Sequence, residues 1–362
     1  MKGKFDITRR GFVKAVGAAC TLGSVPLAFG EEKTSSEKAP SEKAVPAAPL
    51  LPTPSLAAAS ERAKIGCVSW CLHSFKRGED PTDAINTIGD IGFEGTELVL
   101  LAREDIKSFW TDKKIGDLRS RLEKHKLALT QFAIFESVVE GLSSLDAEER
   151  KKNLDFFEAG CVIGKKLGAP RINLVAPWAR ELTGPGGYLP RYFDLSNPKP
   201  GEKFHIGIAK GFDWERVWQV YVDTTQACLE RVKKLELKLS VEPHPHCLLA
   251  DSSSFLRLWD VIRDPDLGYN LDTGWTLLGR EYPPMAIHKV KAHLMNVHMR
   301  DLDAQMRSFV FFGEGVMDFK AIVDTLKMAN YRGYLSIEQD KYQGDMRAVC
   351  KRYLEMIKGY LA

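Results

Sequence analysis

Short apolar runs alternate with amphipathic stretches from Lys64 to the end of the chain, and this alternation limits the fold more than any other feature. Runs rich in Val, Ile and Leu, each followed by a helical pattern, indicate parallel β-α-β units. The predicted strands are Ile65–Trp70, Gly95–Val99, Ala128–Ile134, Arg171–Ala176, Leu237–Glu242, Gly268–Asp272, Leu294–His298 and Tyr334–Glu338. The predicted helices include Asp80–Ile91, Asp146–Leu167, Asp213–Leu235, Ser252–Ile262 and Phe319–Ala329, and a last one follows the eighth strand at Asp345–Gly359.

This repeat predicts an α/β fold, a closed (β/α)8 TIM barrel of roughly 300 residues. A doubly wound open sheet is the alternative, but no Gly-rich nucleotide loop follows the first strand. The connection from Pro177 to Phe212 is long and rich in Gly, Pro and aromatic residues. It leaves the fourth strand at the end where such barrels carry active sites, so we interpret it as a lid or a pocket wall. A cover over the barrel rim or an oligomer contact is the alternative.

Residues 1–30 have the pattern of a cleavable export signal. Arg9 and Arg10 precede an apolar residue and a lysine, and an uncharged stretch runs from Ala15 to Phe29. That stretch is too short to anchor a protein in a bilayer core of roughly 30 Å. The pattern resembles the twin-arginine signal, which implies passage through the twin-arginine translocation machinery to the periplasm. One alternative is that the arginine pair precedes a membrane-anchor helix by chance. Another is that Cys20 carries a lipid.

Composition places the remaining boundary and excludes some functions. Residues 31–63 are mostly Glu, Lys, Ser, Pro and Ala, which predicts a disordered linker before a barrel domain at 64–362. The net charge is +3 and no run of Lys and Arg predicts a nucleic-acid groove. Cys67 and Cys71 lie on one predicted strand, roughly 13 Å apart, whereas a disulfide needs α-carbons within about 7 Å. We therefore interpret the cysteines after the signal as small buried hydrophobic residues.

Four successive predicted strands end in residues that bind metals. Glu242 precedes a proline, Asp272 precedes Thr-Gly, and His298 and Glu338 end the last two strands. Each alone is more often a helix cap or an ion-pair partner, but in a closed barrel the four strand ends meet at one mouth. Three carboxylates and an imidazole would repel one another there unless a cation joined them. The set predicts one divalent metal, Mn²⁺ or Mg²⁺ first, with Co²⁺ and Zn²⁺ as alternatives.

The order Glu-Pro, Asp-Thr-Gly, His-x-x-Asp and a final Ile-Glu resembles the xylose-isomerase-like barrel superfamily of sugar isomerases and epimerases. Gly313-Glu314-Gly315 before the last strand is similar as well, and the resemblance covers residues 64 to 360. The ketose 3-epimerases of that superfamily imply that Glu242 and Glu338 bind the metal and also exchange the substrate proton, whereas Asp272 and His298 are ligands only. Among the metals that suit the oxygen-rich ligand set, Mn²⁺ is expected first.

Two positions depart from the ketose 3-epimerases of that superfamily. Trp275 stands where those enzymes have a histidine that contacts the sugar, and Ala304 stands where they have an arginine. These changes argue against a free ketohexose held in the same way.

Residues next to the ligand set are candidates for substrate binding, and they are His244, His246, Glu97, Trp275 and Arg300. The two histidines follow Glu242 in Glu-Pro-His-Pro-His, where a surface position is the alternative. Glu97 ends the second predicted strand, where it could orient the substrate or a metal ligand. Arg300 lies two residues after His298 and shares its strand face, although an ion pair with Asp301 or Asp303 is equally consistent with the sequence. Trp275 could form an apolar platform for a sugar ring or pack at the rim.

Together these features predict a metal-dependent sugar isomerase or epimerase that removes a proton next to a carbonyl by way of a metal-bound enediolate. A lyase or dehydratase that acts on a keto-sugar or keto-glycoside would use the same site. A non-catalytic carbohydrate-binding barrel is the alternative from another class. The expected partner is a small-molecule sugar, and a homo-oligomer is possible. The sequence leaves open which sugar, which stereocentre and which metal are involved.

Overall fold

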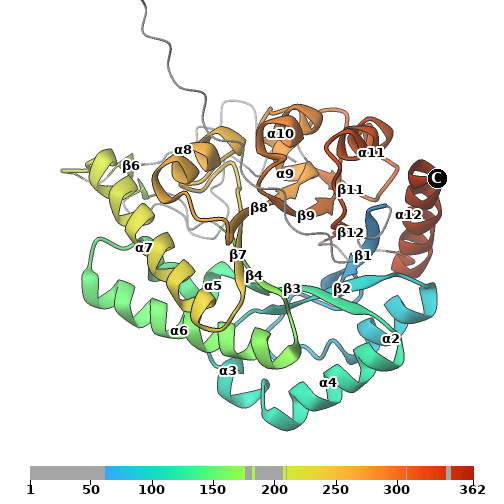
Figure 1. The fold of residues 1–362 in the computed structure, drawn as a ribbon, viewed down its shortest axis with the longest axis horizontal. Coiled ribbons are helices and arrows are strands. Elements are labelled where there is room, and N and C mark those ends of the chain that lie inside the picture. The colour runs from blue at the N-terminus through green and yellow to red at the C-terminus, as the bar shows by residue number, and fades with distance from the viewer. Residues whose placement is uncertain (1–61, 176–181, 184–206, 209, 307, 340–343) are drawn as a thin grey trace, which may run out of the picture. The chain divides into compact units, whose positions relative to one another are not determined.

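The computed structural model describes residues 62–175, 182–183, 207–208, 210–306, 308–339 and 344–362. Eight parallel strands close into a barrel in chain order, with neighbours paired all the way round (Figure 1). They are β1 (Lys64–Val68), β2 (Gly95–Leu100), β3 (Ala128–Ile134), β4 (Arg171–Val175), β7 (Lys238–Glu242), β8 (Leu267–Asp272), β9 (Leu294–Met299) and β12 (Tyr334–Ile337). The fold is the (β/α)8 barrel that the alternating pattern predicts.

Helices cover the outside of the barrel, as Figure 1 shows. The longer ones are α2 (Thr82–Ile91), α4 (Asp112–Lys124), α6 (Ala147–Leu167), α7 (Trp214–Lys234), α8 (Ser252–Ile262), α10 (Pro283–Val290), α11 (Phe319–Met328) and α12 (Met346–Leu361). Short helical segments are η1 (Ser69–Cys71), α3 (Asp105–Ser108), α5 (Glu136–Val139), η2 (Glu140–Ser143) and α9 (Thr273–Leu278). Two small antiparallel pairs, β5 (Leu182–Thr183) with β6 (Gly207–Ile208) and β10 (Asp301–Leu302) with β11 (Phe309–Val310), lie outside the barrel sheet.

Aspartate caps explain where several helices begin. The side chain of Asp146 accepts hydrogen bonds from backbone N–H groups in the first turn of α6, and Asp213 and Asp345 do the same for α7 and α12. Each cap satisfies an N–H group that has no partner within the helix. The predicted starts of these helices therefore coincide with real caps, one residue before the first helical residue.

The first strand differs from its prediction. It ends at Val68, and the next three residues form the 3-10 turn η1, closed by a hydrogen bond from the Leu72 N–H to the Ser69 carbonyl. The assumption that Cys67 and Cys71 share a strand is therefore wrong. The turn also brings the Trp70 indole N–H to Glu338 Oε1 at 3.0 Å, so it is part of the barrel mouth.

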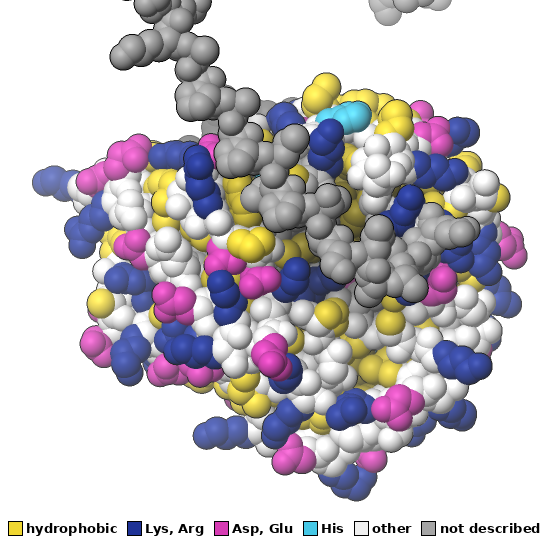
Figure 2. Space-filling model, in the orientation of Figure 1, with side chains coloured by type: hydrophobic (Ala, Val, Ile, Leu, Met, Phe, Trp, Pro, Cys, Tyr) yellow, Lys and Arg dark blue, Asp and Glu magenta, His cyan; other side chains and the backbone are white. Residues whose placement is uncertain are grey.

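Several predictions concern segments outside the described residues. The export signal, nearly all of the linker and most of the 177–212 connection belong to them, so the roles given above remain predictions. Within the described part of the chain, no helix is long and apolar enough to span a membrane. On the face drawn in Figure 2, Lys and Arg side chains are interspersed with Asp and Glu.

Candidate metal centre

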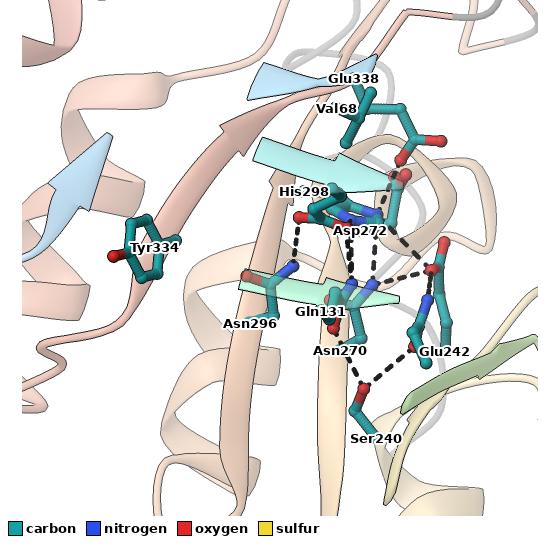
Figure 3. A network of polar contacts seen from close by, with 12 residues as sticks. Val68, Gln131, Ser240, Glu242, Asn270, Asp272, Asn296, His298, Tyr334 and Glu338 are labelled. Atoms are coloured by element: carbon teal, nitrogen blue, oxygen red, sulfur yellow. Dashed lines mark hydrogen bonds and ion pairs between the residues drawn. The ribbon is translucent and has the colours of Figure 1, made fainter. Parts of the chain in front are cut away.

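The four predicted ligands meet at the carboxyl ends of four adjacent strands. Glu242, Asp272 and His298 lie at the ends of β7, β8 and β9, and Glu338 directly follows β12. Each offers a ligand atom within 4.8 Å of those of the other three, and all four side chains are buried. Figure 3 shows them directed toward one another. The barrel therefore assembles residues that are 30, 26 and 40 positions apart in sequence into one cluster.

The two ring nitrogens of His298 have different neighbours. Nδ1 faces the carboxylates, at 2.7 Å from Glu338 Oε2 and 3.5 Å from Glu242 Oε2. Nε2 lies 2.9 Å from Glu97 Oε2. Burial lowers the pKa of His298, but the charges of Glu97, Glu338 and Glu242 outweigh it and hold that pKa well above the usual value. A histidine with one nitrogen on an orienting carboxylate and the other directed at the remaining candidate ligands is the usual arrangement of a metal ligand.

The buried charges of the site do not balance without a cation. Four carboxylates, those of Glu97 and the three acidic ligands, are buried at the mouth, beside the guanidinium of Arg300 and the imidazole of His298 as the positive groups among the described residues. Burial, reinforced by Glu338 and Glu242 and opposed by Arg300, raises the pKa of Asp272 to about 8. A divalent ion would offset this excess of negative charge.

Two oxygens of the cluster support the same conclusion. Asp272 Oδ2 and Glu338 Oε2 are buried and accept no hydrogen bond from the described residues, although charged nitrogens lie near both. Buried polar atoms normally have a hydrogen-bond or metal partner. The residues present therefore fit one divalent metal with three oxygen ligands and one nitrogen ligand.

A polar layer lies below the ligands inside the barrel (Figure 3). Ser240, Asn270, Asn296 and Ser336 each stand two residues before a ligand, so they share its strand face. Asn270 donates from Nδ2 to Glu242 Oε2 at 2.7 Å, and Asn173 donates to the same oxygen at 2.8 Å. Two amide groups thus fix the orientation of this carboxylate. Polar residues inside otherwise apolar strands are the sequence signal for this layer.

Glu97 lies beneath His298, among the polar layer. Its Oε1 accepts a hydrogen bond from Asn296 Nδ2 at 2.9 Å, and its Oε2 accepts one from Gln131 Nε2 at 2.7 Å besides contacting His298. It is fully buried and is not among the described residues that line the cavity. Of its two predicted roles, the geometry favours orienting a metal ligand.

A cavity of about 240 Å³ opens over the ligand cluster. Apolar and aromatic residues form most of its wall. The wall also contains the two proposed catalytic residues, Glu242 and Glu338, and three predicted substrate-binding residues, His244, Trp275 and Arg300. His246 is buried behind this wall, with its ring centroid 5.5 Å from that of Trp275. Three of the five substrate-binding candidates thus lie at the cavity, together with Trp70, whose contact with Glu338 the sequence did not reveal.

Arg300 has acidic ligands as neighbours in place of the partners considered from sequence. Its Nε lies 3.1 Å from Asp272 Oδ2, and its Nη2 forms an ion pair with Glu338 Oε1. Asp301 instead accepts hydrogen bonds from the N–H groups of Gly313, Gly315 and Met317, at 2.9 to 3.1 Å. The Gly-Glu-Gly segment is therefore held against the end of β9 by Asp301.

Comparison with known proteins agrees with this fold. A profile of the xylose isomerase-like TIM barrel family matches residues 85–359, so the chain belongs to that family. No curated protein matches the sequence.

Solved structures of sugar epimerases share the fold. The 3-keto-D-glucoside 4-epimerase of E. coli is 15% identical with a TM-score of 0.62, over 82% of this chain and 100% of that one. The D-allulose 3-epimerase of Methylomonas sp. is 16% identical with a TM-score of 0.62, over 84% and 100%. An L-ribulose 3-epimerase is 18% identical with a TM-score of 0.63, over 83% and 94%. At these identities the likeness establishes the fold.

Proposed function

We propose that this protein is a divalent-metal-dependent sugar isomerase or epimerase that moves a proton next to a carbonyl group. One observation carries the proposal: Glu242 and Glu338 both line the cavity and both belong to the ligand cluster. Two carboxylates that face the same bound molecule provide the base and the acid that such a proton transfer needs. The solved structures with the same fold include epimerases of a keto-glucoside, of allulose and of ribulose, and this supports a sugar as the substrate.

Glu242, Asp272, His298 and Glu338 would hold the metal, for which we propose Mn²⁺ because oxygen ligands predominate. When bound, the ion would stabilise the negative charge that builds on the substrate's oxygens as the proton leaves. Arg300 lines the cavity beside Glu338. It would therefore be in place to bind a hydroxyl or carbonyl oxygen of the substrate.

The protein holds the two proposed proton carriers in different surroundings. Glu242 is fixed at Oε2 by the amide groups of Asn270 and Asn173, and its Oε1 lies 3.1 Å from His244 Nε2. Glu338 contacts the Trp70 indole and the Arg300 guanidinium through Oε1. Burial raises the pKa of Glu338, but Arg300 and His298 outweigh it and lower that pKa to about 2. Glu338 is therefore ionised at neutral pH, which is the state in which a carboxylate can act as a base.

The cavity limits the size of the substrate. Its volume of about 240 Å³ is below the roughly 300–1,000 Å³ of pockets for drug-sized ligands, which suits one sugar unit. Trp70, Phe75, Phe135 and Trp275 give it apolar faces against which the carbon side of a sugar ring can pack. We propose a free keto-sugar or a keto-glycoside as the substrate.

The experiment follows proton exchange in D₂O on a panel of ketoses and 3-keto-glycosides with the Mn²⁺-loaded protein. We expect deuterium uptake at one carbon next to the carbonyl, and loss of turnover by about 10²-fold or more in Glu242→Gln and Glu338→Gln. Glu355→Gln, at an exposed position of α12, is the matched control and should keep full activity.

The products separate the alternatives that share this site. An epimer or isomer supports the proposal, whereas release of a β-substituent identifies a lyase or dehydratase. No exchange on any panel member, with metal bound, would favour a carbohydrate-binding barrel without catalysis. Near-normal turnover by either glutamine variant would show that another residue carries the proton.

A further inference from the structure

The segment after β7 brings together three metal-binding side chains outside the set of four. His244, His246 and Cys247 each offer a ligand atom, and these atoms all lie within 4.8 Å of one another. Both histidines are buried, and the cysteine is half-buried and forms no disulfide. Two imidazoles and one thiol form a ligand set of a different chemical kind from the three carboxylates and one imidazole beside it.

The local backbone explains why these three side chains meet. The Cys247 N–H donates to the His244 carbonyl at 2.8 Å, which closes a four-residue β-turn. Pro245 occupies the second position of the turn, where its fixed φ favours this conformation. The His244 N–H donates to the Leu249 carbonyl at 3.2 Å and holds the turn to the chain that follows. The first, third and fourth residues of one tight turn therefore carry the ligands.

Trp275 holds both imidazoles in place. Its ring stacks on His244 with the centroids 4.4 Å apart and the planes at 27°, and the centroid of His246 is 5.5 Å away. Burial, followed by the neighbouring His244, lowers the pKa of His246 to about 2. The His246 ring is therefore neutral at pH 7, which is the form that binds metals.

We propose that this turn binds a zinc-class transition-metal ion through His244, His246 and Cys247. Ligands at about 2.0–2.3 Å from a tetrahedral Zn²⁺ lie roughly 3.3–3.7 Å from one another. The ligand atoms of the three residues now lie within 4.8 Å of one another. Side-chain movements of about 1 Å would therefore bring them to the tetrahedral geometry. Binding would release the thiol proton to solvent and leave the fourth position for water. A thiolate favours Zn²⁺ over Mn²⁺, so the two sites would select different ions.

The proposed site would be linked to the first one through His244. Its Nε2 contacts Glu242 Oε1 at 3.1 Å, and the ion would be bound through Nδ1. A carboxylate that contacts the outer nitrogen of a metal-bound histidine orients the ring. Because His244 and Trp275 line the cavity, an ion in the turn would fix this part of its wall.

The test is a Co²⁺ titration of the chelator-treated full-length protein, because a thiolate ligand gives Co²⁺ an intense near-ultraviolet charge-transfer absorption. We expect two equivalents of Co²⁺ per chain and this absorption with one of them. Cys247→Ser should abolish the absorption and His246→Ala should weaken the corresponding equivalent by at least about tenfold. Cys228→Ala, at a buried thiol of α7, and His288→Ala, at an exposed histidine of α10, are the matched controls and should change neither.

Asp272→Asn keeps this test separate from the proposed function. It should remove the other equivalent and leave the thiolate absorption, so that the turn site is measured even if the first site binds no metal. A titration without thiolate absorption, or an absorption that survives in Cys247→Ser, would overturn the proposal.

Discussion

Replacing Glu97 with Gln tests how the barrel prepares His298 to bind metal. The carboxylate of Glu97 accepts hydrogen bonds from Asn296 and Gln131 and faces His298 Nε2, with all three distances between 2.7 and 2.9 Å. Glutamine has the same shape but only one acceptor oxygen. Its own N–H₂ group must therefore face one of these donors, which leaves at least one buried group without a partner.

The expected loss is in metal affinity. Removing a partner that orients a ligand costs about 10- to 100-fold in affinity, which equals roughly 1.4–2.8 kcal/mol. The free energy of unfolding of the metal-free protein should fall as well, by about 1–3 kcal/mol, because a buried group is left without a partner and His298 loses a carboxylate that holds its pKa up. Calorimetric titration with Mn²⁺ measures the first quantity and urea unfolding after chelation the second. Glu355→Gln is the control. An affinity for Mn²⁺ within twofold of the parent protein would refute the role given to Glu97.

Three further predictions address pH, a glycine and export. Because the pKa of Asp272 is raised to about 8, the metal-free fold should lose stability as pH rises from about 4 to 8, and the gain in Tm on adding Mn²⁺ should grow over the same range; an equal gain at pH 5.5 and 8.5 would contradict this. Gly315→Ala should lower the free energy of unfolding by about 1–3 kcal/mol, measured by urea unfolding, because a Cβ would lie 2.2 Å from the Leu302 carbonyl oxygen; an unchanged midpoint would contradict it. Replacing Arg9 and Arg10 with Lys should keep the precursor in the cytoplasm of a bacterium with a twin-arginine system, as fractionation would show, and normal export would contradict the interpretation of the signal.

The barrel and its four metal-ligand candidates could be predicted because they depend on local patterns. Buried parallel strands are apolar on both faces, so a carboxylate or imidazole at the end of such a strand is conspicuous, as Glu242 and His298 are. Closure of the barrel then brings the strand ends together without further information. The same pattern contained the polar layer, since Asn270 and Asn296 interrupt apolar strands two residues before a ligand.

Other parts of the site depend on contacts between distant strands. Glu97 and His298 are 201 positions apart, and their pairing follows from side-chain directions across the barrel that no local pattern specifies. Trp70 reaches Glu338 only because the chain turns into η1 after Val68. The residues His244, His246 and Cys247 are close in sequence, but only the turn shows that they converge on one point.

The central claim is that Glu242, Asp272, His298 and Glu338 hold one divalent metal. It is tested most directly by titrating chelator-treated protein with Mn²⁺ while electron paramagnetic resonance measures the free ion. We expect one equivalent of Mn²⁺ per chain in the parent protein, and affinity weakened by well over tenfold in Asp272→Ala and in His298→Ala, since each removes a ligand. His288→Ala should bind like the parent protein. Unchanged Mn²⁺ binding in both ligand variants, or no binding by the folded parent protein, would contradict the account.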